Sequence, residues 1–207
     1  SLWRAIPAFA LPVALTGILE QMSSLIDTMM VGHLSGEAGP AAMAAVGSNT
    51  PITSLLLNLF IGIALGTNVV IANAIGSGDE RTVHKAVHSS VTFAVVGIAV
   101  TVVGELIAEP LLHLLSVPAE NLGQALAFLR VYLLGMPSIL LYNFEAAIFR
   151  SVGITKMPLQ ALALSSLLNV ALVWLFIPVM GWGVAGAAAA TAISYTVSAL
   201  ILFVRLT

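Results

Sequence analysis

The sequence predicts an all-α membrane protein, a bundle of about six transmembrane helices. Three observations favour this class: hydrophobic residues make up 59% of the 207 residues, charged residues make up 8%, and the mean hydropathy is +1.08. A soluble domain usually carries about 25% charged residues. The net charge of −2 gives no attraction for nucleic acid, and the absence of cysteine excludes disulfides and a thiolate nucleophile. The lipid bilayer is therefore the expected surroundings of the chain.

Six apolar stretches are each long enough to cross a hydrocarbon core of about 30 Å as a helix. Segments rich in glycine and proline separate them, as expected for turns. None of these segments is long enough to divide the chain, so we expect residues 1–207 to form a single domain. The predicted helices lie near 7–31, 51–75, 86–108, 122–148, 157–179 and 184–204.

The cations predict the orientation of the bundle. Six of the seven Lys and Arg residues fall before the first stretch, in alternate connections, or after the last: Arg4, Arg81, Lys85, Arg150, Lys156 and Arg205. The positive-inside rule assigns that side to the cytoplasm. Both termini of this multi-pass protein are therefore expected to be cytoplasmic. Arg130 is the exception, and we expect it to snorkel toward the outer interface, with a polar cavity as the alternative.

Two acids lie inside the first apolar stretch, where an ionised carboxylate facing lipid would cost several kcal/mol. Glu20 and Asp27 are seven residues apart, so they share a helix face and lie about 10.5 Å apart along it. Asp27 is expected in the outer half, where a cavity could hydrate it and where dry surroundings would favour its neutral form. Such a group suits a proton- or sodium-coupled carrier, and the alternative for each acid is a hydrogen bond that only holds the bundle together.

Other polar residues inside the stretches have two interpretations. Amides and hydroxyls can hydrogen-bond between helices, or as a set they can supply oxygen ligands to a small hard cation, and their spacing does not choose. They are Asn58, Asn68, Asn73, Asn143, Asn169 and Thr191. Met22 can line a cavity or simply pack. Near the predicted membrane boundaries, Glu145 is expected to pair with Arg150, and the histidines are expected to be interfacial and not a metal site: His33, His84, His88 and His113.

Signatures of enzymes are missing from the sequence. It contains no HExxH, no GxSxG, no phosphate-binding P-loop and no dinucleotide fingerprint. We therefore expect no catalytic residue, no cofactor and no enzymatic activity.

Four stretches, taken together and in order, resemble the multidrug and toxic compound extrusion (MATE) family of cation-coupled antiporters. They are 26–32 (IDTMMVG), 66–79 (GTN through GSGD), 149–158 (FRSVGITKMP) and 181–191 (GWGVAGAAAAT). The resemblance implies a protein of about twelve helices in two lobes that alternate access to a central cavity. This chain would supply one lobe, the N-terminal one. A bacterial cytoplasmic membrane is the location that the resemblance and the compact loops imply.

The resemblance also implies a site. Asp27 matches the cation-responsive carboxylate of the family's first span, with Asn169 and Thr191 as its partners. Many members have an acid four residues after that asparagine, whereas this chain has Val173. The missing carboxylate weakens the case for Na⁺ and favours coupling to H⁺, although either ion remains possible at Asp27. Candidates for the substrate cavity are Glu20, Gln21, Met22, Asn58, Tyr132 and Asn143.

The expected function is a lobe of an antiporter that exports small organic cations or amphiphilic drugs. Its second lobe could come from the same parent chain, from a partner chain or from a homodimer. Two alternatives stay open. One is a lipid-linked precursor flippase of the same superfamily, which would be expected to line its cavity with more basic residues than this chain has. The other is a truncated, inactive lobe that acts only as an assembly module.

Overall fold

The computed structural model describes residues 2–77 and 80–206, except the side chains at 2–6, 8, 67, 75, 80–91 and 93–94. Within these ranges the chain is helical and contains no strand. The helices are α1 (Leu2–Leu34), the short 3₁₀ helix η1 (Gly36–Ala38), α2 (Gly39–Gly76), α3 (Glu80–Leu114), α4 (Ala119–Leu134), α5 (Met136–Ser151), α6 (Lys156–Trp174), the π-helical turn η2 (Leu175–Val179) and α7 (Gly183–Leu206).

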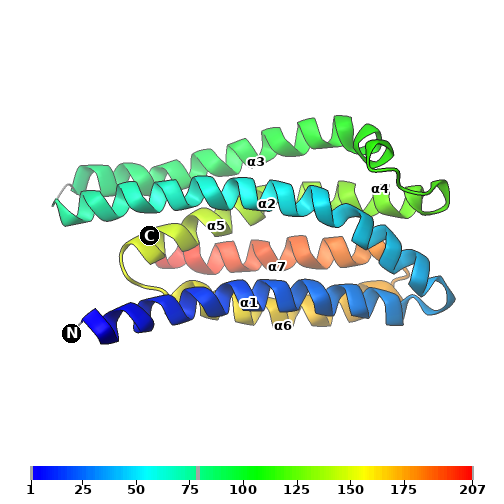
Figure 1. The fold of residues 1–207 in the computed structure, drawn as a ribbon, viewed down its shortest axis with the longest axis horizontal. Coiled ribbons are helices and arrows are strands. Elements are labelled where there is room, and N and C mark those ends of the chain that lie inside the picture. Colours follow the sequence, from blue (N-terminus) through cyan, green and yellow to red (C-terminus); the bar gives the residue numbers. More distant parts are fainter. Residues whose placement is uncertain (1, 78–79, 207) are drawn as a thin grey trace.

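The helices confirm the predicted fold class. In the described part of the chain, five helices are long and apolar enough to cross a membrane. The pair α4 and α5 makes a sixth span if it is counted as one broken helix, bent by 49°. All of these helices run along the long axis of the molecule (Figure 1), as expected for a bundle that spans a bilayer.

Two helices extend well beyond the apolar stretches that predicted them. The second stretch, 51–75, is the C-terminal part of α2, which begins at Gly39. The third stretch, 86–108, is part of α3, which continues through Pro110 to Leu114. Pro51 does not end α2, and the helix before it is anchored by Asn49, whose Nδ2 donates to the Ala125 carbonyl of α4 at 3.0 Å. Helices can therefore continue past proline where tertiary contacts hold the turn before it.

The fourth predicted helix, 122–148, is broken between α4 and α5. Pro137 has no N–H to donate to the carbonyl four residues earlier, that of Leu133. The hydroxyl of Thr101 on α3 donates to this carbonyl instead, at 2.6 Å. On the other side of the break, the Thr196 hydroxyl of α7 lies 2.8 Å from Ser138 Oγ and 2.8 Å from the Ala192 carbonyl oxygen, and it can donate to either. Two neighbouring helices thus contact the bend, and α3 supplies a donor to the Leu133 carbonyl, which a straight helix would pair internally.

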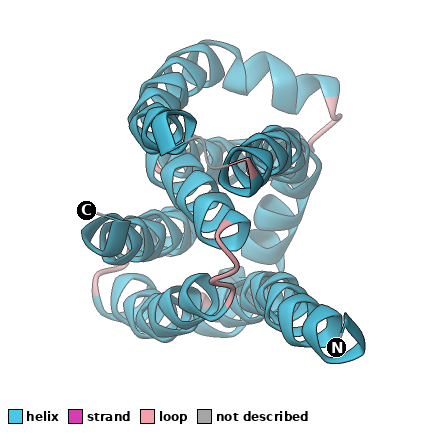
Figure 2. Ribbon diagram, turned by 90° about the vertical axis from the view of Figure 1, so that its left-hand side faces the viewer, coloured by secondary structure: helices cyan, strands magenta, loops and turns pink. Residues whose placement is uncertain are grey.

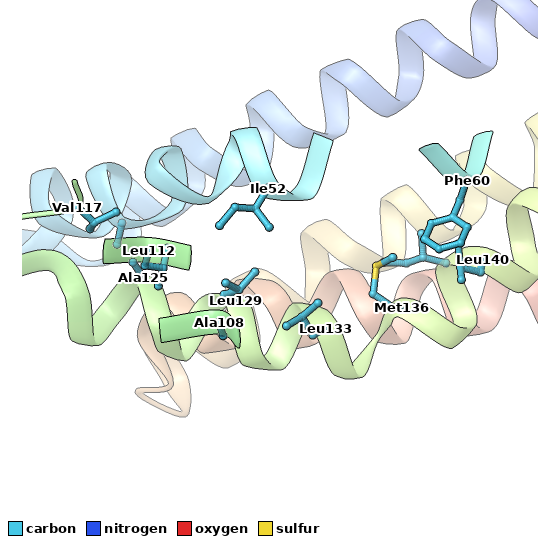
Figure 3. Packing of buried hydrophobic residues seen from close by; sticks show 12 residues of the cluster. Ile52, Phe60, Ala108, Leu112, Val117, Ala125, Leu129, Leu133, Met136 and Leu140 are labelled. Atoms are coloured by element: carbon cyan, nitrogen blue, oxygen red, sulfur yellow. The ribbon is translucent and has the colours of Figure 1, made fainter. Parts of the chain in front are cut away.

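Apolar clusters hold the bundle together. The first joins α2, α3, α4 and α5 around Phe60, Leu129, Leu133 and Met136 (Figure 3). A second joins α1, α2, α7 and the end of α6, and a third joins α5, α6 and α7. Helix α7 packs against α4, α5 and α6, and α1 lies beside α6 (Figures 1 and 2). This arrangement places α1, α6 and α7 next to one another.

The start of α1 and the end of α7, and with them both termini of the described chain, lie at the same end of the bundle, together with the end of α2, the start of α3 and the α5–α6 connection (Figure 1). Arg150, Lys156 and Arg205 belong to helix ends at this side. Five residues of the predicted boundary pattern have side chains outside the described residues: Arg4, Arg81, His84, Lys85 and His88.

One charge contact in the structure was not predicted, and one predicted contact is not formed. Arg130 lies beside Glu105 of α3, with 3.4 Å between Nε and Oε2, so an ion pair accompanies the partial exposure expected of it. The predicted pair of Glu145 and Arg150 is wrong. Glu145 is fully buried, and neither of its carboxyl oxygens has a hydrogen-bond partner among the described residues. Five residues on a helix rotate a side chain by about 140° from its starting direction, so these two residues point apart.

Candidate functional site

A polar cavity of about 190 Å³ lies between α1, α2, α4, α6 and α7. Most of its lining residues carry a hydroxyl, amide or carboxyl group, which is unusual inside an apolar bundle. These are Glu20, Gln21, Ser23, Ser24, Asp27, Thr28, Thr50, Thr53, Ser54, Tyr132, Ser165, Ser166, Asn169, Thr191, Ser194 and Tyr195.

Helix α1 contributes both carboxylates of the cavity. Glu20 and Asp27 are two turns apart and face the cavity, with Ser23 and Ser24 between them. The opposite face of α1 is apolar and exposed, as expected for a surface in contact with lipid or another apolar partner. It carries Leu11, Leu15, Ile18, Met22, Leu25 and Met29. Because the apolar side of α1 faces outward, its polar side, with Glu20 and Asp27, faces the cavity.

Asp27 lies at the meeting point of three helices. The Thr191 hydroxyl of α7 lies 3.4 Å from Asp27 Oδ2 and 3.1 Å from the carbonyl oxygen of Ala187, and it can donate to either. Nδ2 of Asn169, on α6, donates to Thr191 Oγ1 at 3.3 Å. The two side-chain contacts are longer than the usual hydrogen-bond distance of about 2.7–3.0 Å. The contacts of Thr191 with Asp27 and Asn169 are therefore weak hydrogen bonds, which a small shift of the side chains can break or shorten.

Three buried oxygens of the cavity have no hydrogen-bond partner among the described residues: Asp27 Oδ1, Asn169 Oδ1 and Ser194 Oγ. Buried polar atoms are nearly always paired in folded proteins, and each exception calls for an explanation. Here the two orphaned oxygens of Asp27 and Asn169 belong to the same contact group. These acceptors could receive a proton, a water molecule or a small cation.

Among the described residues that line it, the cavity carries acidic groups and no basic side chain. Arg150, at the end of α5, interacts electrostatically with Glu20. Aromatic rings form another part of the wall: Phe128 and Tyr132 stack with 6.0 Å between their ring centroids, and Tyr195 lies on α7. Carboxylates and aromatic faces both attract organic cations.

The structure brings together six of the nine residues that the sequence selected. Thr191 contacts both Asp27 and Asn169, and Glu20, Gln21 and Tyr132 line the same cavity as these three.

Three other cavity candidates do not line it. Met22 points outward from α1 and is 53% exposed. Asn58 and Asn143 each donate to the carbonyl one turn earlier in their own helix, at 2.7 Å to Ser54 and 2.8 Å to Ile139. A polar side chain that bonds its own helix needs no cavity, and the residue type alone does not reveal this.

Sequence reasoning missed the serines of the cavity. Ser23 Oγ of α1 donates to Ser166 Oγ of α6 at 3.0 Å, and Ser165 pairs with Ser198 of α7. A signal was available, because Ser23 and Ser24 lie three and four residues after Glu20, and Ser165 lies four residues before Asn169. Residues at these spacings share a helix face.

Val173 occupies the position where the family resemblance led us to look for a second acid. It is fully buried in the apolar cluster that contains Val31, Ala42 and Phe176. An ionised group would be costly at this point. Val173 therefore adds no polar group to the cavity.

Comparisons with known proteins agree with this architecture. A family model described as MatE matches residues 12–175. The chain is 30% identical to the "Probable multidrug resistance protein YoeA" of Bacillus subtilis, over 100% of this chain and 45% of that protein.

Solved structures agree as well. A MATE structure in the bent conformation superposes with a TM-score of 0.88 at 30% identity, over 96% of this chain and 44% of that one. The outward-facing conformation of a multidrug resistance MATE family transporter gives a TM-score of 0.87 at 30% identity, over 98% and 44%. The chain thus spans less than half the length of these relatives. It belongs to the MATE family, whose members are transporters and not enzymes.

Proposed function

We propose that the chain forms one lobe of a cation-coupled antiporter that exports organic cations or amphiphilic drugs by alternating access. The observation that supports this most directly is the position of Asp27. It lies in the wall of a polar cavity, within reach of the Thr191 hydroxyl and with its second oxygen unpartnered among the described residues. Asp27, Asn169 and Thr191 form the proposed coupling site.

Coupling follows from the charge of Asp27. A carboxylate accepts the hydrogen bond of Thr191, whereas a protonated carboxyl can donate one to Asn169 Oδ1, which has no partner among the described residues. Binding of a proton therefore changes the contacts among α1, α6 and α7. The ion shifts the lobe from one conformation to the other only if it binds the two conformations with different affinities. The change of hydrogen-bond partners at Asp27 would give the proton such a difference in affinity.

We propose H⁺ as the coupling ion. The contact group holds one carboxylate, and the described residues include no cluster of three acidic or histidine side chains. Val173, in its apolar cluster, offers no ligand where a second acid would strengthen a sodium site. A single acid with an amide and a hydroxyl suits a proton better than a strongly hydrated cation.

The proposed substrate is an organic cation. Glu20 and Asp27 supply negative charge, Gln21 an amide and Tyr132 an aromatic ring, and none of the described lining residues is basic. An anionic lipid-linked precursor would find no positive partner in this wall, which argues against the flippase alternative. The cavity of about 190 Å³ is smaller than the pockets of about 300–1,000 Å³ that hold drug-sized ligands. A second lobe would supply the rest.

The partner lobe is part of the proposal. Relatives have more than twice the length that this chain covers. The second lobe would come from the same parent chain, from a partner chain or from a second copy. We also propose that the end of the bundle with both termini faces the cytoplasm of a bacterial cell, as the distribution of Lys and Arg predicts.

The test is dye efflux from proteoliposomes that contain the chain together with its second lobe. We expect a pH gradient, and not a sodium gradient, to drive efflux of a fluorescent organic cation. Asp27→Asn should abolish the coupled efflux without lowering the amount of inserted protein. Glu109→Gln, which changes an exposed acid on α3, is the matched control and should transport like the wild type. Undiminished coupled efflux by the Asp27→Asn variant would contradict the assignment.

A further inference from the structure

We propose that Glu20 is a second proton-carrying group of the cavity, through which the proton of Asp27 exchanges with the end of the bundle where both termini lie. This inference rests on the proposed function, since it requires Asp27 to bind the coupling proton. In the transfer, Asp27 gives up a proton and becomes a carboxylate, while Glu20 accepts a proton and becomes a carboxylic acid. Glu20 then releases the proton to water, so no oxidant or other reactant is needed.

The position of Glu20 suits this role. It lies on the same face of α1 as Asp27, in the same cavity, about 10.5 Å closer to the N-terminal end of that helix. Arg150, which interacts electrostatically with it, lies at the helix end on the same side of the bundle. A proton leaving Asp27 toward that side meets Glu20 as the next carboxyl group of the cavity wall.

Hydroxyl groups line the same cavity as the two acids. Ser23 lies between them on α1 and donates to Ser166 Oγ of α6 at 3.0 Å. Ser194 of α7 is buried with an unpartnered Oγ among the described residues, and it lines the same space. A cavity of about 190 Å³ that is lined by polar groups has room for several water molecules. Serine hydroxyls and waters both accept and donate hydrogen bonds, which is what a proton relay requires.

The surroundings of Glu20 leave its carboxyl available. Among the described residues, Glu20 forms no ion pair within 4 Å, since the one found there joins Arg130 and Glu105. The Glu20 side chain also makes no hydrogen bond to the described residues. In the described part of the chain, Arg150 interacts electrostatically with Glu20, as do three tyrosines on three other helices: Tyr132, Tyr142 and Tyr195. The Tyr142 hydroxyl is engaged with the Pro158 carbonyl at 3.3 Å. An acid that only held the bundle together would be expected to have such a fixed partner.

The first experiment counts the carboxyls that change protonation. Infrared difference spectra of the reconstituted chain, recorded across a pH jump, should contain carboxyl bands that disappear separately in Asp27→Asn and in Glu20→Gln. Glu109→Gln should leave both bands unchanged. Thermal unfolding of the Glu20→Gln variant, measured in the same membranes, verifies that it is folded. A Glu20→Gln spectrum that is identical to the wild-type spectrum would overturn the proposal.

The second experiment measures the rate of pH-gradient-driven efflux of the fluorescent cation. We expect Glu20→Gln to slow the coupled efflux severalfold and Glu20→Asp to restore most of it. If Asp27→Asn abolishes coupled efflux and Glu20→Gln does not slow it, the relay is wrong and the proposed function stands. If Asp27→Asn transports normally, the proposed function itself is wrong. The two failures are therefore distinguishable.

Discussion

At the scale of single residues, the hydroxyl of Thr191 connects three helices at one point. It lies between Asp27 of α1 and the Asn169 amide of α6, and it also reaches the carbonyl one turn earlier in α7. We expect Thr191→Val, which keeps the shape and removes the hydroxyl, to weaken proton coupling roughly tenfold, since a hydrogen bond to a charged group contributes about 1.5 kcal/mol.

Efflux driven by graded pH differences measures this coupling. Thr191→Ser should restore it, because serine returns the hydroxyl. Thr92→Val, at an exposed position on α3, serves as the matched control. Equal coupling in the valine and serine variants would show that the hydroxyl plays no part.

The residues of the site were predictable to different degrees. Asp27 is visible in the sequence because a carboxylate inside an apolar stretch is expensive, whereas Asn169 and Thr191 were selected through the family resemblance. The serines were not selected, because a hydroxyl in an apolar helix can always bond the carbonyl one turn earlier, as Ser48 does at 2.7 Å. Only the packing of helices decides whether such a group faces a cavity. Glu145 was misjudged because closeness in sequence is not closeness on a helix surface.

At the scale of elements, the break between α4 and α5 depends on a donor from another helix. Thr101→Val should leave the Leu133 carbonyl without its partner and destabilise the fold by about 1 kcal/mol, a cost typical of one lost hydrogen bond. Thermal unfolding in detergent measures this loss. The double variant Thr101→Val with Pro137→Ala should recover part of it, because alanine supplies the N–H that proline lacks. If the loss of stability in the double variant equals the sum of the losses in the two single variants, the alanine N–H does not replace the Thr101 hydroxyl as donor.

The contact of α3 with α5 requires a glycine. A Cβ at Gly97 would lie 2.6 Å from Pro137 Cα, a backbone atom that cannot move aside alone. We expect Gly97→Ala to destabilise the lobe by about 1–3 kcal/mol, as overpacking does in cores. Gly62→Ala, where nothing lies within 4 Å of the new carbon, should leave the unfolding temperature nearly unchanged. Similar losses in both variants would mean that helix propensity and not contact controls the result.

Helix boundaries were less predictable than the helices themselves. Hydropathy marks the part of a helix that lies in hydrocarbon, and it does not report the turns beyond. Pro137 was visible as a place to bend, but the donor that stabilises the bend, Thr101, lies 36 residues earlier and became evident only from packing.

At the scale of the whole molecule, the activity should follow the presence of two lobes. The cavity of about 190 Å³ on one lobe is too small to enclose a drug-sized ligand, which usually occupies a pocket of about 300–1,000 Å³. We therefore expect coupled efflux only from samples whose mass, measured by light scattering in nanodiscs, corresponds to two lobes. Coupled efflux from a sample that contains one lobe alone would contradict the proposed architecture.

The shared end of the two termini has a consequence for how a second lobe can be attached. Because α1 begins and α7 ends on one side of the bundle (Figure 1), a copy joined in tandem enters the membrane from the same side and in the same direction. The two halves would then be related by rotation about the membrane normal, as in parallel internal repeats. No extra crossing is needed between them, so a short polar linker is sufficient. A tandem duplication of the gene would thus produce two halves with the same membrane topology.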